Sequence, residues 1–160
     1  MKAVTVKQLK KELTNKSPSE VVELCLHLSK FKRENKELLT YLLFESSNQQ
    51  EYINSIKEDI NEQFGKINKA TNYLTKKGVR KILRDTKKYI RYSKNKETEV
   101  ELLLYFCKKL MHFIHTVKNN SVLINIHNRE IESIKKKLAT LHEDLQYDYE
   151  SELKTIDADY

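Results

Sequence analysis

Apolar residues recur along the chain three or four positions apart, which is the spacing of one face of a helix. In the second segment, for example, Val21, Leu24, Cys25 and Leu28 share one stripe. The pattern predicts about seven helices with short connections, over residues 5–15, 17–32, 35–43, 48–64, 72–92, 96–118 and from 121 to beyond 145. We therefore expect an all-α protein that ends in a long C-terminal helix.

Five of the predicted helix starts carry a Ser, Thr or Asn whose side chain can accept a hydrogen bond from a free backbone N–H group. These residues are Thr5, Ser17, Asn35, Asn48 and Asn95. Gln8 and Glu20 stand three residues after the first two, which predicts reciprocal capping boxes. Gly65 interrupts the fourth stripe, so we expect a bend or a helix end there.

Two local patterns predict core positions. The short third segment holds Leu38, Leu39, Leu42 and Leu43 and is apolar around most of its girth, which predicts a central place in the core. Cys25 and Cys107 both stand in apolar runs, so we expect both thiols to be buried and unpaired.

The composition excludes several fold classes. The chain of 160 residues has two glycines and one proline, too few for the tight turns of a β-sandwich or barrel. Gly65 and Gly78 are too far apart for a dinucleotide-binding or P-loop motif. We predict one domain over 1–145, either a compact bundle or a short right-handed stack of helical pairs. Residues 146–160 are acidic and are predicted to be frayed or extended.

Three further features of the sequence predict a cytoplasmic location. The N-terminal residues lack the apolar core of a signal peptide. The apolar stretch at 38–44 is far shorter than the roughly 20 residues that span a bilayer. Two cysteines make no disulfide framework, as is usual in a reducing compartment. We therefore expect no membrane association.

Positive charge is concentrated in the middle of the chain. Residues 66–96 hold twelve basic side chains and a single acid, Asp85. Six of the cations fall on the face opposite the apolar stripe of the predicted helix 76–92: Lys77, Arg80, Lys81, Arg84, Lys88 and Arg91. Neighbouring like charges three or four residues apart repel one another, so a polyanion would stabilise this face.

We interpret these six residues as polyanion-binding, with Tyr89 and Tyr92, or Tyr73, stacking on exposed bases. Phosphate contacts of this kind carry little sequence selectivity. The alternative is an ordinary solvated face, neutralised in part by acids at 58–62 or in the C-terminal segment.

No catalytic or metal site is predicted, and no cofactor. His112 and His115 share a helix face, but neither Glu-x-x-His nor His-Glu-x-x-His occurs in the sequence. No Ser or Cys has the setting of an activated nucleophile. We therefore predict a non-enzymatic protein.

A second hypothesis is self-association through the C-terminal helix. Apolar residues recur along it with the seven-residue repeat of a coiled coil and form a seam. The seam includes Ile131, Ile134, Leu138, Leu141 and Leu145. Two copies of the chain would pair along this seam if the helix continues past 145.

Two blocks resemble a known family. ELCLHLSKFKRENKELLTYLLFES at 23–46 and KYIRYSKNKETEVELLLYFCKKL at 88–110 are similar to an uncharacterised, all-helical bacterial family. The resemblance implies a bacterial cytosolic protein and brings no activity, ligand or catalytic residue with it. The sequence as a whole predicts a helical scaffold or interaction module whose basic helix contacts nucleic acid or an acidic protein.

Overall fold

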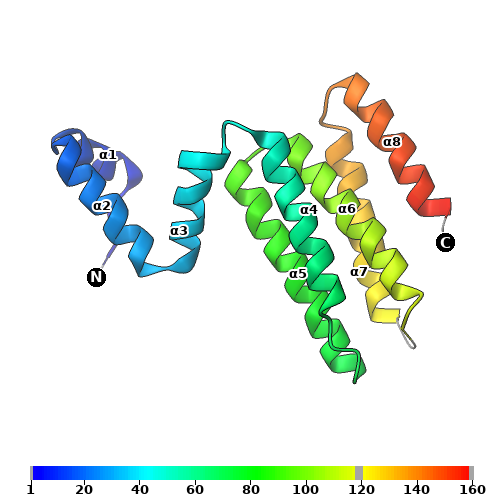
Figure 1. The fold of residues 1–160 in the computed structure, drawn as a ribbon. Helices are drawn as coiled ribbons and strands as arrows, with labels where there is room; N and C mark the ends of the chain where they lie inside the picture. Colours follow the sequence, from blue (N-terminus) through cyan, green and yellow to red (C-terminus); the bar gives the residue numbers. More distant parts are fainter. Residues whose placement is uncertain (1, 118–120, 159–160) are drawn as a thin grey trace. The chain divides into compact units, whose positions relative to one another are not determined.

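The computed structural model describes residues 2–117 and 121–158, and this part of the chain is all-helical (Figure 1). It contains eight α-helices and one short π-helix, with no strand in the described ranges. The all-α prediction is confirmed. The helix count is eight rather than about seven, because the long C-terminal helix that we expected is two helices.

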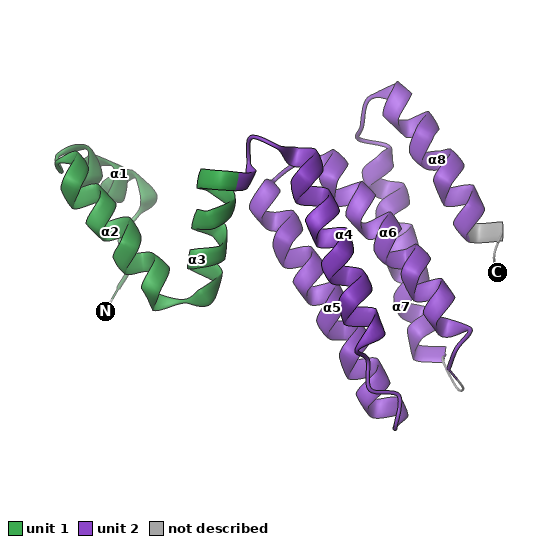
Figure 2. Ribbon diagram, viewed as in Figure 1, with its two compact units in different colours: residues 1–44 green, residues 45–160 purple. Residues whose placement is uncertain are grey.

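The chain divides into two compact units, coloured separately in Figure 2. Unit 1 is Met1–Phe44 and unit 2 is Glu45–Tyr160. The helices of unit 1 are α1 (Val6–Thr14), α2 (Pro18–Phe31) and α3 (Arg33–Thr40), and the π-helix η1 (Tyr41–Glu45) lies at the boundary. Unit 2 contains α4 (Gln49–Gly65), α5 (Asn72–Ser93), α6 (Lys96–Ile114), α7 (Ser121–Leu138) and α8 (Glu143–Ala158). A single domain over 1–145 stays a prediction.

Capping side chains set the starts of α1 and α2 as predicted. The predicted cap of the third helix is wrong: α3 begins at Arg33 without a side-chain cap, and Asn35 lies inside it and donates to the Leu28 carbonyl. Thr5 and Gln8 form a reciprocal capping box before α1, and Ser17 and Glu20 form another before α2. The backbone N–H of Ser17 and the ammonium group of Lys16 both donate to the Glu20 carboxylate, which lowers the pKa of Glu20 to about 2.

The apolar residues of unit 1 do not form the core that we expected. Cys25 is exposed, and so are Leu42 and Leu43 of the segment that we predicted to be central. Among residues 2–44, only Tyr41 is buried. The physical reason is that α2 packs mainly on the eight-residue α3, so no second layer within the unit covers these faces. Helical periodicity identified the apolar faces correctly but not whether a neighbour covers them.

Unit 2 is built around α6, which packs against α4, α5, α7 and α8. This helix is the most apolar predicted segment, and it is buried on nearly all sides, from Val100 to Ile114. Phe106 is fully buried, with its ring centroid 5.8 Å from that of Phe64 on α4. The expected burial of Cys107 is confirmed.

The C-terminal helix is interrupted within the predicted seam. α7 ends at Leu138, and a turn closed by Thr140 N–H donating to the Lys137 carbonyl at 2.9 Å precedes α8. Ile131, Ile134 and Leu138 are buried within unit 2, while Leu141 and Leu145 are half-buried. Three of the five seam residues are therefore core of unit 2, and the helix that would present the seam is interrupted after Leu138.

The acidic C-terminal segment also differs from the expectation of a frayed or extended end. Residues 143–158 form α8, which packs against α6 and α7 and buries Leu153 and Ile156. Tyr149 is half-buried there, and its burial together with the nearby Glu101 carboxylate raises the pKa of its hydroxyl. Burial of these two apolar side chains holds α8 against the rest of unit 2, although most of its residues are polar.

The contrast between the two cysteines makes a direct test of the fold. Cys25 is expected to react with a colorimetric thiol reagent in the native protein, because its side chain is exposed. Cys107 is expected to react only after denaturation, since burial excludes the reagent and raises the pKa of the thiol. Titration should count one thiol per chain before urea is added and both afterwards. Two native thiols would contradict the packing of α6, and none would contradict the exposure of α2.

Candidate polyanion-binding face

Helix α5 places the predicted cations by presenting two opposite faces. Thr71 caps the start of α5 by accepting from the Leu74 N–H. The C-terminal cap is Lys94, whose φ of 52° is the left-handed conformation that often terminates a helix. One face is buried against α4, α6 and α7. The buried residues are Thr75, Val79, Ile82, Leu83, Thr86 and Ile90.

The six predicted cations lie on the opposite face of α5, and we call them the basic face: Lys77, Arg80, Lys81, Arg84, Lys88 and Arg91. Five of them are exposed and Lys88 is half-buried. Because the buried stripe holds the helix against three neighbours, the cations lie on the side of α5 away from the core.

Carboxylates neutralise little of this face. Within the described ranges, Lys77, Arg80, Lys81 and Arg91 have no acidic partner within ion-pair distance. Arg84 Nε lies 3.8 Å from Asp85 Oδ1, which is a long ion pair. Repulsion between neighbouring cations on the helix is therefore largely uncompensated.

The acids that we considered as internal counter-charges are placed elsewhere. α8 packs on α6 and α7, whereas α5 packs on α4, α6 and α7 (Figure 1). In the 58–62 segment, Glu62 pairs with Lys66, whose ammonium group lowers the pKa of the Glu62 carboxyl, and Asp59 accepts from Gln63. Among the described residues, no acid of either set lies within ion-pair distance of Lys77, Arg80, Lys81 or Arg91.

The tyrosines that we predicted to stack on bases differ in how far their rings are exposed. Tyr89 and Tyr92 are half-buried, with their rings edge to face at 6.1 Å, and Lys88 Nζ lies 4.7 Å from the Tyr89 ring centroid. Their rings already have partners within the protein. Tyr73, at the start of α5, is 71% exposed and is better placed for a ligand.

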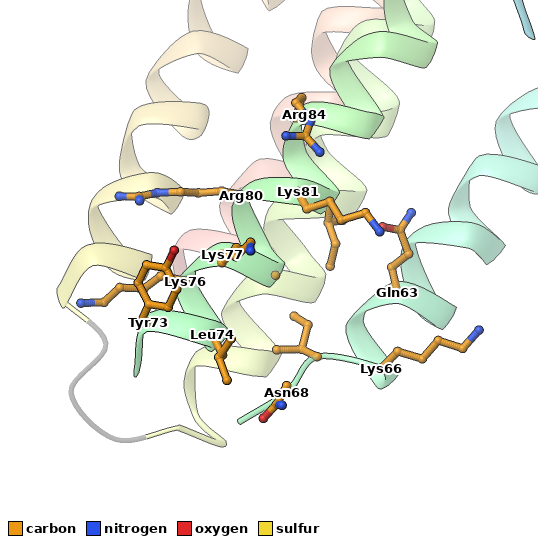
Figure 3. A pocket seen from close by; sticks show the side chains of 13 residues that line it. Gln63, Lys66, Asn68, Tyr73, Leu74, Lys76, Lys77, Arg80, Lys81 and Arg84 are labelled. Atoms are coloured by element: carbon orange, nitrogen blue, oxygen red, sulfur yellow. The ribbon is translucent and has the colours of Figure 1, made fainter. Parts of the chain in front are cut away.

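A groove adjoins the first half of the basic face (Figure 3). It has a volume of about 600 Å³ and lies between the end of α4, residues 66–68 and α5. Four residues of the basic face line it: Lys77, Arg80, Lys81 and Arg84. Sequence reasoning missed the contribution of Gln63, Ile67 and Asn68, which become neighbours of α5 only when the chain turns back after α4.

The other side chains that we considered for chemistry are Cys107 on α6 and the histidines at the end of that helix. Burial and the nearby Glu130 carboxylate raise the pKa of Cys107, which keeps this thiol protonated and unreactive. His112 and His115 are both exposed. In the part of the chain that the structure describes, no group of three His, Cys, Asp or Glu residues is arranged to hold a metal ion.

No protein-family model matches this chain, and comparisons with curated proteins and with solved structures find no significant match. The resemblance to a bacterial helical family therefore stays a prediction. None of the helices in the described ranges has both the length and the apolar character needed to cross a bilayer. Structurally, the chain is defined as an all-helical protein with one cation-rich helix face.

Proposed function

We propose that this protein is a non-enzymatic helical interaction module that binds an acidic partner, nucleic acid above all, through the basic face of α5. The observation that carries the proposal is that four cations of this face have no carboxylate partner in the described ranges. Phosphates of a nucleic acid would relieve their repulsion, and counterions released from the polyanion would favour binding.

The type of contact sets the expected selectivity. Lysine and arginine side chains that meet phosphates read no base sequence, so binding is expected to be largely independent of sequence and to weaken steeply with salt. Packing of α5 against α4, α6 and α7 holds the backbone positions from which the cations project.

Reversal of two charges tests the proposal. Lys77→Glu combined with Lys81→Glu is expected to weaken binding of a labelled oligonucleotide at least about 10-fold at low salt, because two charge-assisted contacts become repulsive. The slope of log affinity against log salt is expected to fall by roughly 1.4 in magnitude for a single strand. Fluorescence anisotropy at several salt concentrations measures both effects.

The matched control is Lys108→Glu combined with Lys136→Glu, which makes the same change in net charge on α6 and α7. Both lysines are exposed and lie outside the basic face. If the control weakens binding as much as the test variant does, attraction follows net charge and the assignment to α5 fails. Absence of binding by the unaltered protein at micromolar concentration and low salt would remove the proposal altogether.

The structure offers no support for the second hypothesis, pairing through the C-terminal seam. Ile131, Ile134 and Leu138 are occupied within unit 2, and the helix that would present them ends at Leu138. A second copy would have to displace the core of this unit to reach them.

A further inference from the structure

The groove beside α5 combines positive charge with an apolar floor. Its six basic lining residues are Lys66, Lys76, Lys77, Arg80, Lys81 and Arg84, and no acid lines it. Its apolar lining is Ile67, Leu74 and Ile82. A volume of about 600 Å³ lies within the range of small-ligand sites in proteins. The cations are sufficient to bind phosphates, so the apolar residues that line the groove are left for another part of the ligand.

Gly78 explains why the floor is continuous. A Cβ atom at this position would lie 3.2 Å from Ile67 Cγ1, which is closer than ordinary van der Waals contact. Glycine inside a helix is less favourable than alanine. Here it lets the segment after α4 approach α5 closely, so that Ile67 and Leu74 line the same groove.

Tyr73 provides an unoccupied aromatic ring at the same end of α5. Its ring is 71% exposed, and Lys76 and Arg80 follow it by three and seven residues, one and two helical turns along. Figure 3 shows Lys76 and Arg80 extending to the same side as Tyr73, whereas Lys81 extends in the opposite direction, toward Gln63 of α4. The groove therefore has cations on both sides of the helix and one ring beside them.

Two amide side chains at the groove are held in defined orientations. Gln63 donates from Nε2 to Asp59 at 2.6 Å, which leaves its Oε1 to accept a hydrogen bond. Asn68 accepts from the Ala70 N–H at 2.8 Å, which leaves its Nδ2 hydrogens to donate. One acceptor and one donor thus remain among the residues that line the groove.

We infer that the ligand of this groove is single-stranded nucleic acid, with phosphates on Lys77, Arg80, Lys81 and Arg84 and a base stacked on Tyr73. This inference rests on the proposed function and names the form of nucleic acid that is bound. A neighbouring base covers the apolar floor, within reach of Gln63 and Asn68. A duplex hides the faces of its bases within the stack, so it would leave both Tyr73 and the floor unused.

The test compares anisotropy titrations of three probes: an oligothymidine of about 12 nucleotides, a duplex of the same length and inorganic polyphosphate as a competitor. The single strand is expected to bind more tightly than the duplex. Tyr73→Ala is expected to weaken single-strand binding about 5- to 100-fold, since one stacked base is lost. Tyr73→Phe retains the ring and should bind like the unaltered protein.

The control is Tyr147→Ala, because Tyr147 is 77% exposed on α8, away from the basic face. It should change binding of neither the single strand nor polyphosphate, and polyphosphate should bind the three tyrosine variants as it binds the unaltered protein. If Tyr73→Ala has no effect while the Lys77→Glu and Lys81→Glu variant still loses binding, the groove inference is overturned and the proposed function survives. Tighter binding of the duplex would overturn the inference too. Equal competition by polyglutamate per unit charge would identify an acidic protein as the partner instead.

Discussion

Phe106→Ala is expected to lower the free energy of unfolding by about 3–5 kcal/mol, because it opens a cavity in the core of unit 2. Phe106 is 0% exposed, and its ring packs beside Phe64 in the contact between α6 and α4. The surrounding helices contact α6 from several sides, so they cannot all move inward to fill the space. Urea denaturation followed by far-UV circular dichroism measures the loss.

Phe44→Ala is the control for this cavity. The residue is of the same type but 75% exposed, at the end of unit 1. Its replacement is expected to change the free energy of unfolding by no more than about 0.5 kcal/mol. Comparable losses in the two variants would show that the apolar residues of unit 1 are covered in solution, contrary to the exposure described above.

Lys87→Met is expected to lower the free energy of unfolding by about 3 kcal/mol, because it leaves a buried carboxylate with one cation instead of two. Glu130 on α7 is 1% exposed. Lys87 Nζ of α5 lies 2.7 Å from its Oε2 without hydrogen-bond geometry, so the attraction there is Coulombic. Arg129 Nη2 lies 3.2 Å from the other oxygen, Oε1.

Removing both charges is expected to restore most of the lost stability. In the variant Lys87→Met with Glu130→Leu, no charge remains buried, and the free energy of unfolding should return to within about 1 kcal/mol of the unaltered protein. A double-mutant cycle of urea denaturation measures the coupling between the two side chains. Lys16→Met, which breaks the half-exposed pair with Glu20, should cost less than about 1 kcal/mol. If the effects of the two single substitutions simply add, the pair does not stabilise the contact between α5 and α7.

Lys87 shows that a run of cations in the sequence does not tell which of them are paired with acids in the folded protein. It belongs to the run of cations in residues 66–96, yet it is committed to an ion pair with Glu130. The six cations assigned to the basic face were separated from it by helical spacing, and the structure places them opposite the buried stripe. The role of these six in binding stays a prediction.

Four of the five predicted helix caps are confirmed, because capping is a contact over two or three residues, whereas the cap predicted at Asn35 is wrong. Thr5, Ser17, Asn48 and Asn95 each accept the predicted backbone hydrogen bond. The end of α4 at Gly65 was predicted for a similarly local reason. The break after Leu138 was not predicted, because the turn that follows contains neither glycine nor proline and the apolar seam continues through it.

The sequence was sufficient for the all-α class, most helix boundaries and the cation-bearing face of α5, since these depend on neighbours a few residues apart. It was not sufficient for the exposure of Cys25, the packing of α8 or the groove formed by Gln63, Ile67 and Leu74. Those features depend on which helix faces meet. An apolar stripe has the same spacing whether a neighbouring helix covers it or water does, so only the three-dimensional packing could decide between the two.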